Sequence, residues 1–440
     1  MKKLLLILLC LPFIGFGQGW EKTFGQPSQM ELGSSVHQTT DGGYIIAGHI
    51  GDVPVSSSYL IKTDNNGLLD WSQVYGGGIY SEVARCVRQI NNGDYIIRGL
   101  KFDTISGGIT SYLRKIDPNG IVQWNIDDYL HAIVGDNSVQ QTNDGGYIIV
   151  GLELDTVNWT GVIPQLIKLD GNGTELWKQP LVSMLTFANW VNSYPHYIQQ
   201  TMDGGYIISG TNSNLGLGLL DMIILKTDIN GIEQWSISLT DSSSNYFNSS
   251  IKQTSDSGYI VLGSKIDSVS QDPPNGILIK INSSGIVQWQ KNLGFTIGNS
   301  VQQANDGGYI IGGAKIDSVS EKGILIKTDN NGVEQWNKSF GNGLLEISSF
   351  NSVQQIFDGG YIALGSKVVN FNTSILDFDM YLVKTDSLGN ITSTFNIPIN
   401  SNRKLQKTVD LLGRESKPQK NIPFIEIYDD GTVEKKITID

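Results

Sequence analysis

Four histidines are the side chains best suited to acid-base or metal chemistry in this 440-residue chain: His37, His49, His131 and His196. The sequence contains no HxH or HExxH motif and no Cys/His cluster, so the spacing does not predict a zinc site. No GxSxG motif marks a nucleophilic serine, although the members of a Ser/His/Asp triad need not be adjacent in sequence. We therefore predict no catalytic residue and no metal ligand, and leave an enzymatic role open.

Oxygen ligands gather in turns of the DxNG type, such as Asp64 to Gly67 and Asp329 to Gly332. Each turn offers one carboxylate with neighbouring amides and lacks a bidentate glutamate at the spacing of an EF-hand loop. Asp and Asn also stabilise tight turns by hydrogen bonding to their own backbone. We expect structural turns and no cofactor, with calcium binding as the alternative.

Aromatic side chains form the candidate ligand site. Aromatics with nearby hydroxyls and amides suit glycan stacking or peptide capture. They lie in one variable link and its neighbouring loop: Trp159, Trp190, Tyr194, His196 and Tyr197. Alternatively, these rings fill the gap between neighbouring repeat units.

These residues must be positioned by a repeat of about 50 residues that occurs seven times. Its first half is typified by TDGGYIIAG (Thr40 to Gly48), and the tyrosines of the copies are Tyr44, Tyr95, Tyr147, Tyr206, Tyr259, Tyr309 and Tyr361. A second half, typified by YLIKTDNNGLLDW (Tyr59 to Trp71), ends in tryptophan in six copies. The apolar residues form short bursts bounded by Asp, Asn and Gly, which indicates strands and tight hairpins.

Four strands fit each unit, and in the third unit we predict them near Ser138 to Thr142, Tyr147 to Gly151, Gln165 to Leu169 and Thr174 to Leu181. Seven such units suit a radial β-propeller, in which neighbouring blades protect the sheet edges. A β-solenoid is the alternative, although its coils are usually shorter. The recurring Tyr and Trp rings are expected to pack between blades rather than to stack on sugars.

The two ends of the repeat array complement each other. The seventh unit has Ser393 where the other six place tryptophan, and the segment WEKTFG (Trp20 to Gly25) matches WNKSFG (Trp336 to Gly341). We therefore predict that the N-terminal segment supplies the outer strand of the last blade and closes the ring. The overall prediction is an all-β, seven-bladed propeller closed by its N-terminal strand, followed by a small C-terminal β module.

An up-and-down blade places both short turns of every unit on one face. The other connections vary, as in Gly48 to Ser58 and Leu181 to His196, so the opposite face is the expected functional face. Aspartates recur at the root of four of these loops, where we expect them to cap the loop or, alternatively, to form a ligand ring: Asp103, Asp155, Asp267 and Asp317.

Charge and targeting signals limit the classes of function. A net charge of -12 argues against a nucleic-acid partner, which needs concentrated Lys and Arg. Met1 to Gly17 is typical of a signal peptide, with a basic start and an apolar run too short to span a membrane comfortably, which predicts export and no integral membrane segment. Lipoprotein processing at Cys10 is the rival interpretation. Cys86 would then be the single mature cysteine, and we expect it to be a buried strand residue.

The repeat also resembles known proteins. Its KxDxxGxxxW half is similar to the tryptophan-docked blades of bacterial PQQ-like propellers, and its DGGY half to repeats of secreted Bacteroidetes proteins. The segment from Asn402 to Asp440 resembles the C-terminal sorting domain of type IX secretion cargo, through DLLGRE (Asp410 to Glu415) and DGTVEKKITI (Asp430 to Ile439). This likeness implies export through the periplasm and recognition of the tail by the secretion machinery; an ordinary β-hairpin appendage is the alternative.

We therefore expect a signal peptide at 1–17, a propeller at 18–397 and a sorting module at 398–440. The expected function is that of a secreted or cell-surface, noncatalytic binding protein with a glycan or protein ligand on the variable face. An extracellular polysaccharide hydrolase or lyase and an architectural surface protein are the alternatives.

Overall fold

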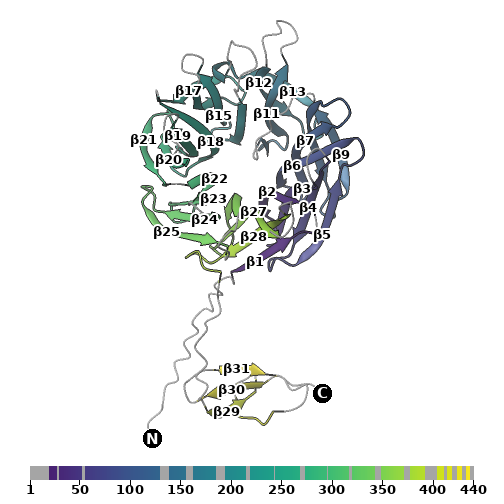
Figure 1. Cartoon of the computed structure of the whole chain (residues 1–440), viewed down its shortest axis with the longest axis vertical. Coiled ribbons are helices and arrows are strands. Elements are labelled where there is room, and N and C mark those ends of the chain that lie inside the picture. The colour runs from purple at the N-terminus through teal and green to yellow at the C-terminus, as the bar shows by residue number, and fades with distance from the viewer. Residues whose placement is uncertain are drawn as a thin grey trace. The chain divides into compact units, whose positions relative to one another are not determined.

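The computed structural model describes residues 19–26, 29–51, 55–128, 138–154, 162–184, 194–214, 219–241, 243–267, 273–294, 296–316, 320–341, 348–370, 377–391, 404–410, 414–418, 424–428 and 433–436. The described residues form seven four-stranded antiparallel sheets and one three-stranded sheet. The four-stranded sheets are blades arranged radially in a β-propeller (Figure 1). No helix in these ranges is long and apolar enough to cross a membrane.

Six blades run in chain order from an inner strand at the axis to an outer strand at the rim. The first three blades consist of β2 (Glu31–Gln38), β3 (Tyr44–Ile50), β4 (Ser57–Thr63) and β5 (Leu69–Tyr75); β6 (Tyr80–Gln89), β7 (Tyr95–Asp103), β8 (Ile109–Ile116) and β9 (Val122–Asp128); and β10 (Val139–Gln141), β11 (Tyr147–Leu154), β12 (Val162–Leu169) and β13 (Glu175–Pro180). A 3-10 turn, η1 (Val182–Met184), follows the third blade.

The next blades repeat this order. They consist of β14 (Tyr194–Gln200), β15 (Tyr206–Asn214), β16 (Leu219–Thr227) and β17 (Glu233–Leu239); β18 (Ser244–Gln253), β19 (Tyr259–Asp267), β20 (Asn275–Ile281) and β21 (Val287–Asn292); and β22 (Thr296–Gln303), β23 (Tyr309–Ile316), β24 (Glu321–Thr328) and β25 (Glu334–Phe340). The four strands predicted for the third unit are confirmed as β10 to β13.

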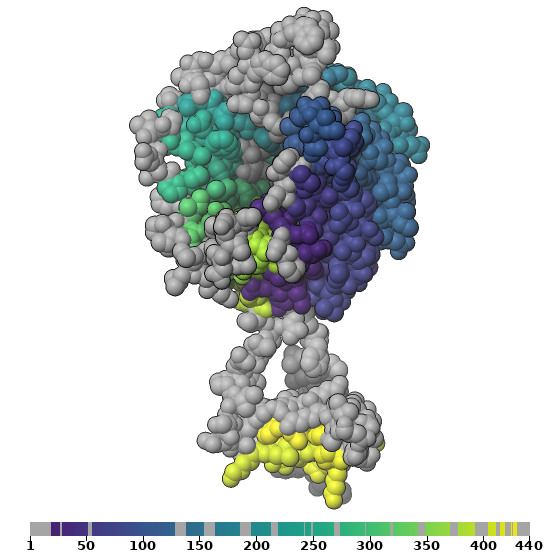
Figure 2. Space-filling model, turned by 45° about the vertical axis from the view of Figure 1, so that its right-hand side comes forward, coloured from purple at the N-terminus to yellow at the C-terminus, as the bar shows by residue number. Residues whose placement is uncertain are grey.

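The seventh blade joins the two ends of the propeller. It contains β26 (Ser348–Gln355), β27 (Tyr361–Asn370) and β28 (Asp377–Thr385), and its outer strand is β1 (Trp20–Phe24), paired from Trp20 with Lys384 to Phe24 with Met380. In Figure 2 the purple N-terminal residues lie directly beside the yellow-green residues of this blade. The predicted closure by the N-terminal strand is therefore confirmed.

Burial follows from this radial arrangement. Every residue of β3 is buried, because the second strand of a blade is covered on both faces by its neighbours. The outer strand β5 is exposed or half-buried throughout, because its outer edge and much of its surface face solvent. The continuous apolar runs after each DGG turn thus mark strands buried on both sides.

One tryptophan at the outer strand of each blade docks on the next blade. It lies edge-on or tilted against the repeated tyrosine of that blade, with ring centroids 5.8 to 6.3 Å apart in all seven interfaces. In the closing interface Trp20 contacts Tyr44 and covers Gly67, whose φ is +73°. A Cβ at Gly67 would lie 2.5 Å from the Trp20 ring, so the glycine serves both the turn and the docking. The predicted packing role of the rings is confirmed.

A lysine on the third strand ties the first hairpin turn to its own blade. The lysine Nζ lies 2.7 to 3.1 Å from the aspartate of the turn in every blade: Lys62–Asp41, Lys115–Asp94, Lys168–Asp144, Lys226–Asp203, Lys280–Asp256, Lys327–Asp306 and Lys384–Asp358. In most blades these are the Lys of KxD and the Asp of DGG, whereas the second blade uses Asp94, which follows the glycine of its turn.

The chain divides into two compact units, Met1–Ile391 and Thr392–Asp440. The second unit contains an antiparallel sheet of β29 (Leu405–Val409), β30 (Phe424–Tyr428) and β31 (Val433–Lys436). Val409, Phe424 and Tyr428 are buried in this unit. The expectation of a small C-terminal β module is confirmed, whereas its sorting role stays a prediction.

Candidate functional site

The inner strands are irregular at one recurring position near the axis. Six of them leave one residue out of register with the second strand, which forms a β-bulge. Such bulges redirect side chains and are common beside binding sites. The bulged residues are Ser34, Arg85, His196, Ser249, Asn299 and Asn351.

Three of these bulged residues line a cavity of about 420 Å³. Its described walls come from the first, second, sixth and seventh blades: Met30, Leu32, Gly33, Ser34, His49, Arg85, Glu321, Ser348, Ser349, Asn351, Ser366 and Phe378. They lie toward the end of each blade where inner and third strands begin and second strands end, which is the end opposite the DGG turn. The cavity therefore lies toward the variable-loop face, and its volume is within the usual range for a small-molecule site.

Hydrogen bonds between blades hold part of the wall in place. The Gly33 N–H donates to Ser366 Oγ at 3.1 Å, and Asn351 Nδ2 donates to the Gly33 carbonyl at 2.8 Å. Ser348 Oγ accepts the Gly323 N–H at 2.9 Å. These groups are positioned before any ligand arrives, so binding would not need to order them.

His49 is a buried polar group of this wall whose hydrogen bonding is incomplete. Its side chain is 7% exposed, and its Nδ1 has no hydrogen-bond partner among the described residues. Burial, with a smaller contribution from the charge of Arg85, lowers the pKa of His49 to about 4. The ring is therefore neutral at neutral pH, and a buried polar atom without a partner is uncommon unless water or a ligand completes it.

Glu321 is the acidic group of this wall. Burial raises the pKa of its carboxyl group. Among the described lining residues it is the single carboxylate, whereas glycoside hydrolysis generally uses a pair. With Arg85, His49 and the serines, the wall offers hydrogen bonds to hydroxyl groups beside the apolar surface of Leu32 and Phe378. This chemistry suits the binding of a polar ligand.

The aromatic site predicted from the sequence is only partly within the described chain. Trp159 and Trp190 lie outside the described residues, and Tyr194 begins β14. His196 and Tyr197 follow on the same inner strand, so they belong to the fourth blade rather than to an interblade link. His196 and Tyr197 are not among the described residues that line the cavity around His49.

Tyr197 is buried between two blades. The side chain is 1% exposed and packs in the core between the fourth and fifth blades, because its strand is covered by the neighbouring blade. This packing corresponds to the alternative given for the aromatic residues, in which a ring fills the gap between neighbouring repeat units. The half-buried His196 has its Nε2 3.4 Å from Thr211 Oγ1, and burial lowers its pKa to about 4. Ligand binding by these two residues stays a prediction.

The carboxylates of the acidic turns accept hydrogen bonds from backbone N–H groups of the same turn. Asp64 Oδ1 accepts the N–H groups of Asn66 and Leu68, both at 2.8 Å. Asp103 Oδ1 likewise accepts the N–H groups of Ile105 and Ser106, at 2.8 and 3.1 Å, and so caps its loop as expected. Asp155 and Asp317 lie outside the described residues. In the described ranges no three His, Cys, Asp or Glu side chains are grouped for a metal ion.

His49, Arg85 and Glu321 are not among the ligand-binding residues predicted from the sequence. A signal for Arg85 was present in the inner strands, where NSVQQ occurs at Asn137, Asn299 and Asn351 while the second unit has RCVRQ from Arg85. Departures from a repeat consensus at axial positions would have identified Arg85. For Glu321 no such signal is visible.

No protein-family model matches this chain, and no curated protein matches it either. Similar solved structures include a protein of unknown function from Dyadobacter fermentans, with a TM-score of 0.49, 9% identity and coverage of 83% of this chain and 97% of that one. The β-propeller domain of the Trilobed protease from Pyrococcus furiosus matches with a TM-score of 0.45, 10% identity and coverage of 84% and 98%. The NanB sialidase from Streptococcus pneumoniae matches with a TM-score of 0.45, 8% identity and coverage of 83% and 70%. At these identities a shared activity does not follow.

Proposed function

We propose that this chain is an exported β-propeller that acts as a noncatalytic binding protein and takes a hydroxyl-rich ligand of the glycan class in the cavity around His49. The observation that carries the proposal is the buried His49 Nδ1, which has no partner among the described residues and lies in a cavity of about 420 Å³. Ser349, Asn351 and Arg85 offer further hydrogen bonds, and Phe378 offers an apolar face for a sugar ring.

A hydrolase is the second candidate, because the raised pKa of Glu321 would suit a general acid. The binding role is preferred because the described wall holds one carboxylate and not two. Product analysis separates the two: a hydrolase releases shorter glycans from a bound polysaccharide, whereas a binding protein leaves the chain length unchanged.

The binding test is a thermal-shift and calorimetry screen of the full chain against plant, algal and bacterial oligosaccharides. A ligand that binds only the folded state, at a hundredfold excess over its Kd, stabilises it by about 2.7 kcal/mol. Two variants take residues from equivalent positions in other blades: His49→Ser, as at Ser264 and Ser366, and Arg85→Asn, as at Asn299 and Asn351. We expect either to weaken binding about tenfold, while Lys291→Gln on the outer strand β21 leaves it unchanged. Equal binding by all three variants would remove this cavity from consideration.

Export is proposed from Met1 to Gly17 and from the likeness of the tail to a type IX sorting domain. The tail would contact the secretion machinery and leave the protein released or at the cell surface. Expression of the chain with and without 398–440 in a bacterium that has this pathway tests the tail. We expect the truncated chain to be retained in the periplasm; surface display without the tail would overturn this part of the proposal.

A further inference from the structure

The inner strands share a second repeated position, one residue before their last glutamine. Four blades carry glutamine there, and its Oε1 accepts the backbone N–H of the last glutamine of the next blade at 2.7 to 2.9 Å: Gln140 to Gln200, Gln199 to Gln253, Gln302 to Gln355 and Gln354 to Gln38. The other three blades carry a basic side chain instead: His37, Arg88 and Lys252. All three residues that depart from the glutamine consensus are therefore basic.

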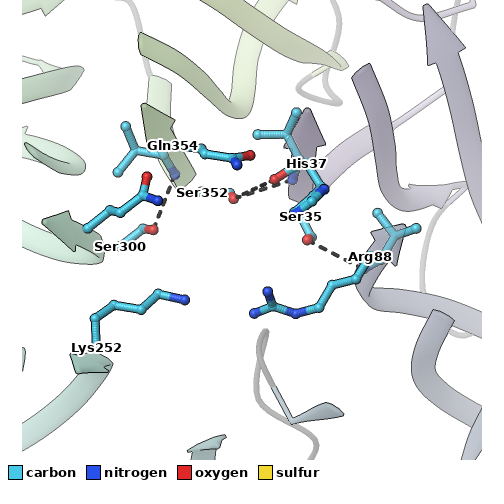
Figure 3. A pocket seen from close by; sticks show the side chains of 11 residues that line it. Ser35, His37, Arg88, Lys252, Ser300, Ser352 and Gln354 are labelled. Atoms are coloured by element: carbon cyan, nitrogen blue, oxygen red, sulfur yellow. Dashed lines mark hydrogen bonds between the residues drawn. The ribbon is translucent and has the colours of Figure 1, made fainter. Parts of the chain in front are cut away.

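These three side chains meet although they belong to the first, second and fifth blades. They line one cavity of about 100 Å³ at the axis, together with Ser35, Ser300, Ser352, Gln302 and Gln354. Figure 3 shows Arg88 and Lys252 extending toward each other from opposite sides, with His37 and Ser35 beside Arg88. Lys252 Nζ also lies 4.9 Å from the centre of the Tyr197 ring, which supports the position of its charge.

The charged side chains that line this cavity are positive, although the chain as a whole is negatively charged. The net charge is -12, yet none of the described residues lining the cavity is Asp or Glu. Burial and the charges of Arg88 and Lys252, which face His37, lower the pKa of His37 to about 4. Two positive charges that suppress protonation of a nearby imidazole create a positive potential, and such a potential attracts an anion.

The cavity also presents uncharged hydrogen-bonding groups. Ser35 Oγ accepts the Val87 N–H at 3.4 Å and Ser300 Oγ accepts the Val353 N–H at 3.2 Å, so both hydroxyl hydrogens can be donated elsewhere. His37 Nδ1 is buried and has no hydrogen-bond partner within the described chain. Charged donors beside hydroxyl donors are the groups that bind phosphate, sulfate and carboxylate.

We propose that this axial cavity, lined by His37, Arg88 and Lys252, binds a small oxyanion. A volume of about 100 Å³ holds roughly three waters at about 30 Å³ each, which suits phosphate, sulfate or a short carboxylate rather than an oligosaccharide. The described residues that line this site include none of those that line the cavity around His49. It is therefore independent of the glycan proposal, and either can fail without the other.

The test is calorimetric titration of the full chain, at low ionic strength, with inorganic phosphate, sulfate and malonate in turn. Arg88→Gln and Lys252→Gln install the consensus residue of the other blades, which already fits this position of the fold. We expect the wild-type chain to bind at least one of these anions, and each variant to raise its Kd at least tenfold. Lys291→Gln removes the same charge from β21 and should leave the Kd within twofold.

The pH dependence gives a second readout. A bound anion faces His37 together with Arg88 and Lys252, so it favours the protonated imidazole and proton uptake accompanies binding. The Kd should fall as the pH is lowered from 7 to 5, and His37→Gln should reduce this dependence, with sulfate as the probe because its charge is constant over that range. No binding of any of the three anions at millimolar concentration, or equal binding by the Arg88→Gln/Lys252→Gln double variant with its melting temperature retained, would overturn the proposal.

Discussion

The backbone N–H of Phe357 in the seventh blade donates a hydrogen bond of 2.9 Å to Oε1 of Gln38 in the first blade, across 319 residues of sequence. The Nε2 of Gln38 donates at 3.3 Å to the carbonyl of Gly42 in its own turn. The last glutamine of every inner strand repeats the first bond, with distances of 2.7 to 2.9 Å, and so joins the seven blades in a closed ring.

Gln38→Ala should therefore weaken the contact between the first and last blades. It removes two hydrogen bonds, each contributing about 0.5–1.5 kcal/mol, and leaves the Phe357 N–H unpaired, so the free energy of unfolding should fall by about 1–3 kcal/mol. Chemical denaturation of the full chain measures this. Gln123→Ala on the exposed face of β9 is the control and should change stability by no more than about 0.5 kcal/mol. Equal effects of the two substitutions would contradict a role for the ring.

Trp20→Ala tests the closure by β1. It removes the ring that packs on Tyr44 at 5.9 Å and covers Gly67, and we expect a loss of about 2–4 kcal/mol. Trp336→Ala, which breaks the equivalent contact with Tyr361 at 5.8 Å inside the continuous chain, gives the reference value. If Trp20→Ala costs far less than Trp336→Ala in the same denaturation experiment, β1 does not secure the seventh blade.

Glu31 should make the protein less stable as the pH rises. Burial raises its pKa from 4.5 to about 7, and the nearby carboxylates of Asp379 and Asp377 act in the same direction. Between pH 4.5 and 7 the folded state therefore binds more protons at this site than the unfolded state, so its contribution to stability falls as the pH increases. Unfolding free energies measured across this range should show the decline, and Glu31→Gln should reduce it. An unchanged slope in the variant would place the origin of the decline elsewhere.

The pKa of Asp41 is shifted in the opposite direction to that of Glu31, so Asp41 makes the protein less stable as the pH falls, and it does so at lower pH. Burial by itself would raise its pKa, but the bonds to Thr39, Lys62 and the Gly43 N–H together outweigh burial and lower the pKa to about 2. The stabilisation that Asp41 provides is complete above the unfolded pKa near 3.8 and is lost as the pH falls toward 2. Acid titration of the folded state, followed by circular dichroism, should show a weaker loss between pH 4 and 2 for Asp41→Asn. The matched control is Glu175→Gln, at an exposed position of β13.

Ser257→Gly is expected to stabilise the fifth blade. Ser257 is the non-glycine residue with positive φ in the described chain, at +64°, and the six other blades place glycine at this position of the turn. The left-handed conformation costs a non-glycine residue about 1–2 kcal/mol, while glycine adds about 0.5–1 kcal/mol of unfolded-state entropy. A net gain of about 0.5 kcal/mol should appear as a higher melting temperature. A lower melting temperature would show that the serine side chain stabilises the folded state by more than the left-handed backbone conformation destabilises it.

The blade and its closure could be derived from the order of the residues alone. The spacing of Tyr44 and its six equivalents specified seven units, and the missing tryptophan at Ser393 together with Trp20 predicted how the ends join. These features are local and repeated: turns need glycine, buried strands need apolar runs, and each interface needs the same two rings. Once the strands and turns of one unit are assigned correctly, the same assignment therefore applies to the other units.

The side chains that meet at the axis could not be derived in this way. His37, Arg88 and Lys252 are distant in sequence, and they share a cavity because the ring of blades brings their inner strands together. Likewise, Arg85 comes close to His49 through a bulge in β6 and the packing of the second blade on the first. Tyr197 is buried because the fifth blade covers its strand. The spacing of residues in the sequence gives the period of the repeat. The burial and direction of a side chain near the propeller axis depend on strand register and on contacts between blades.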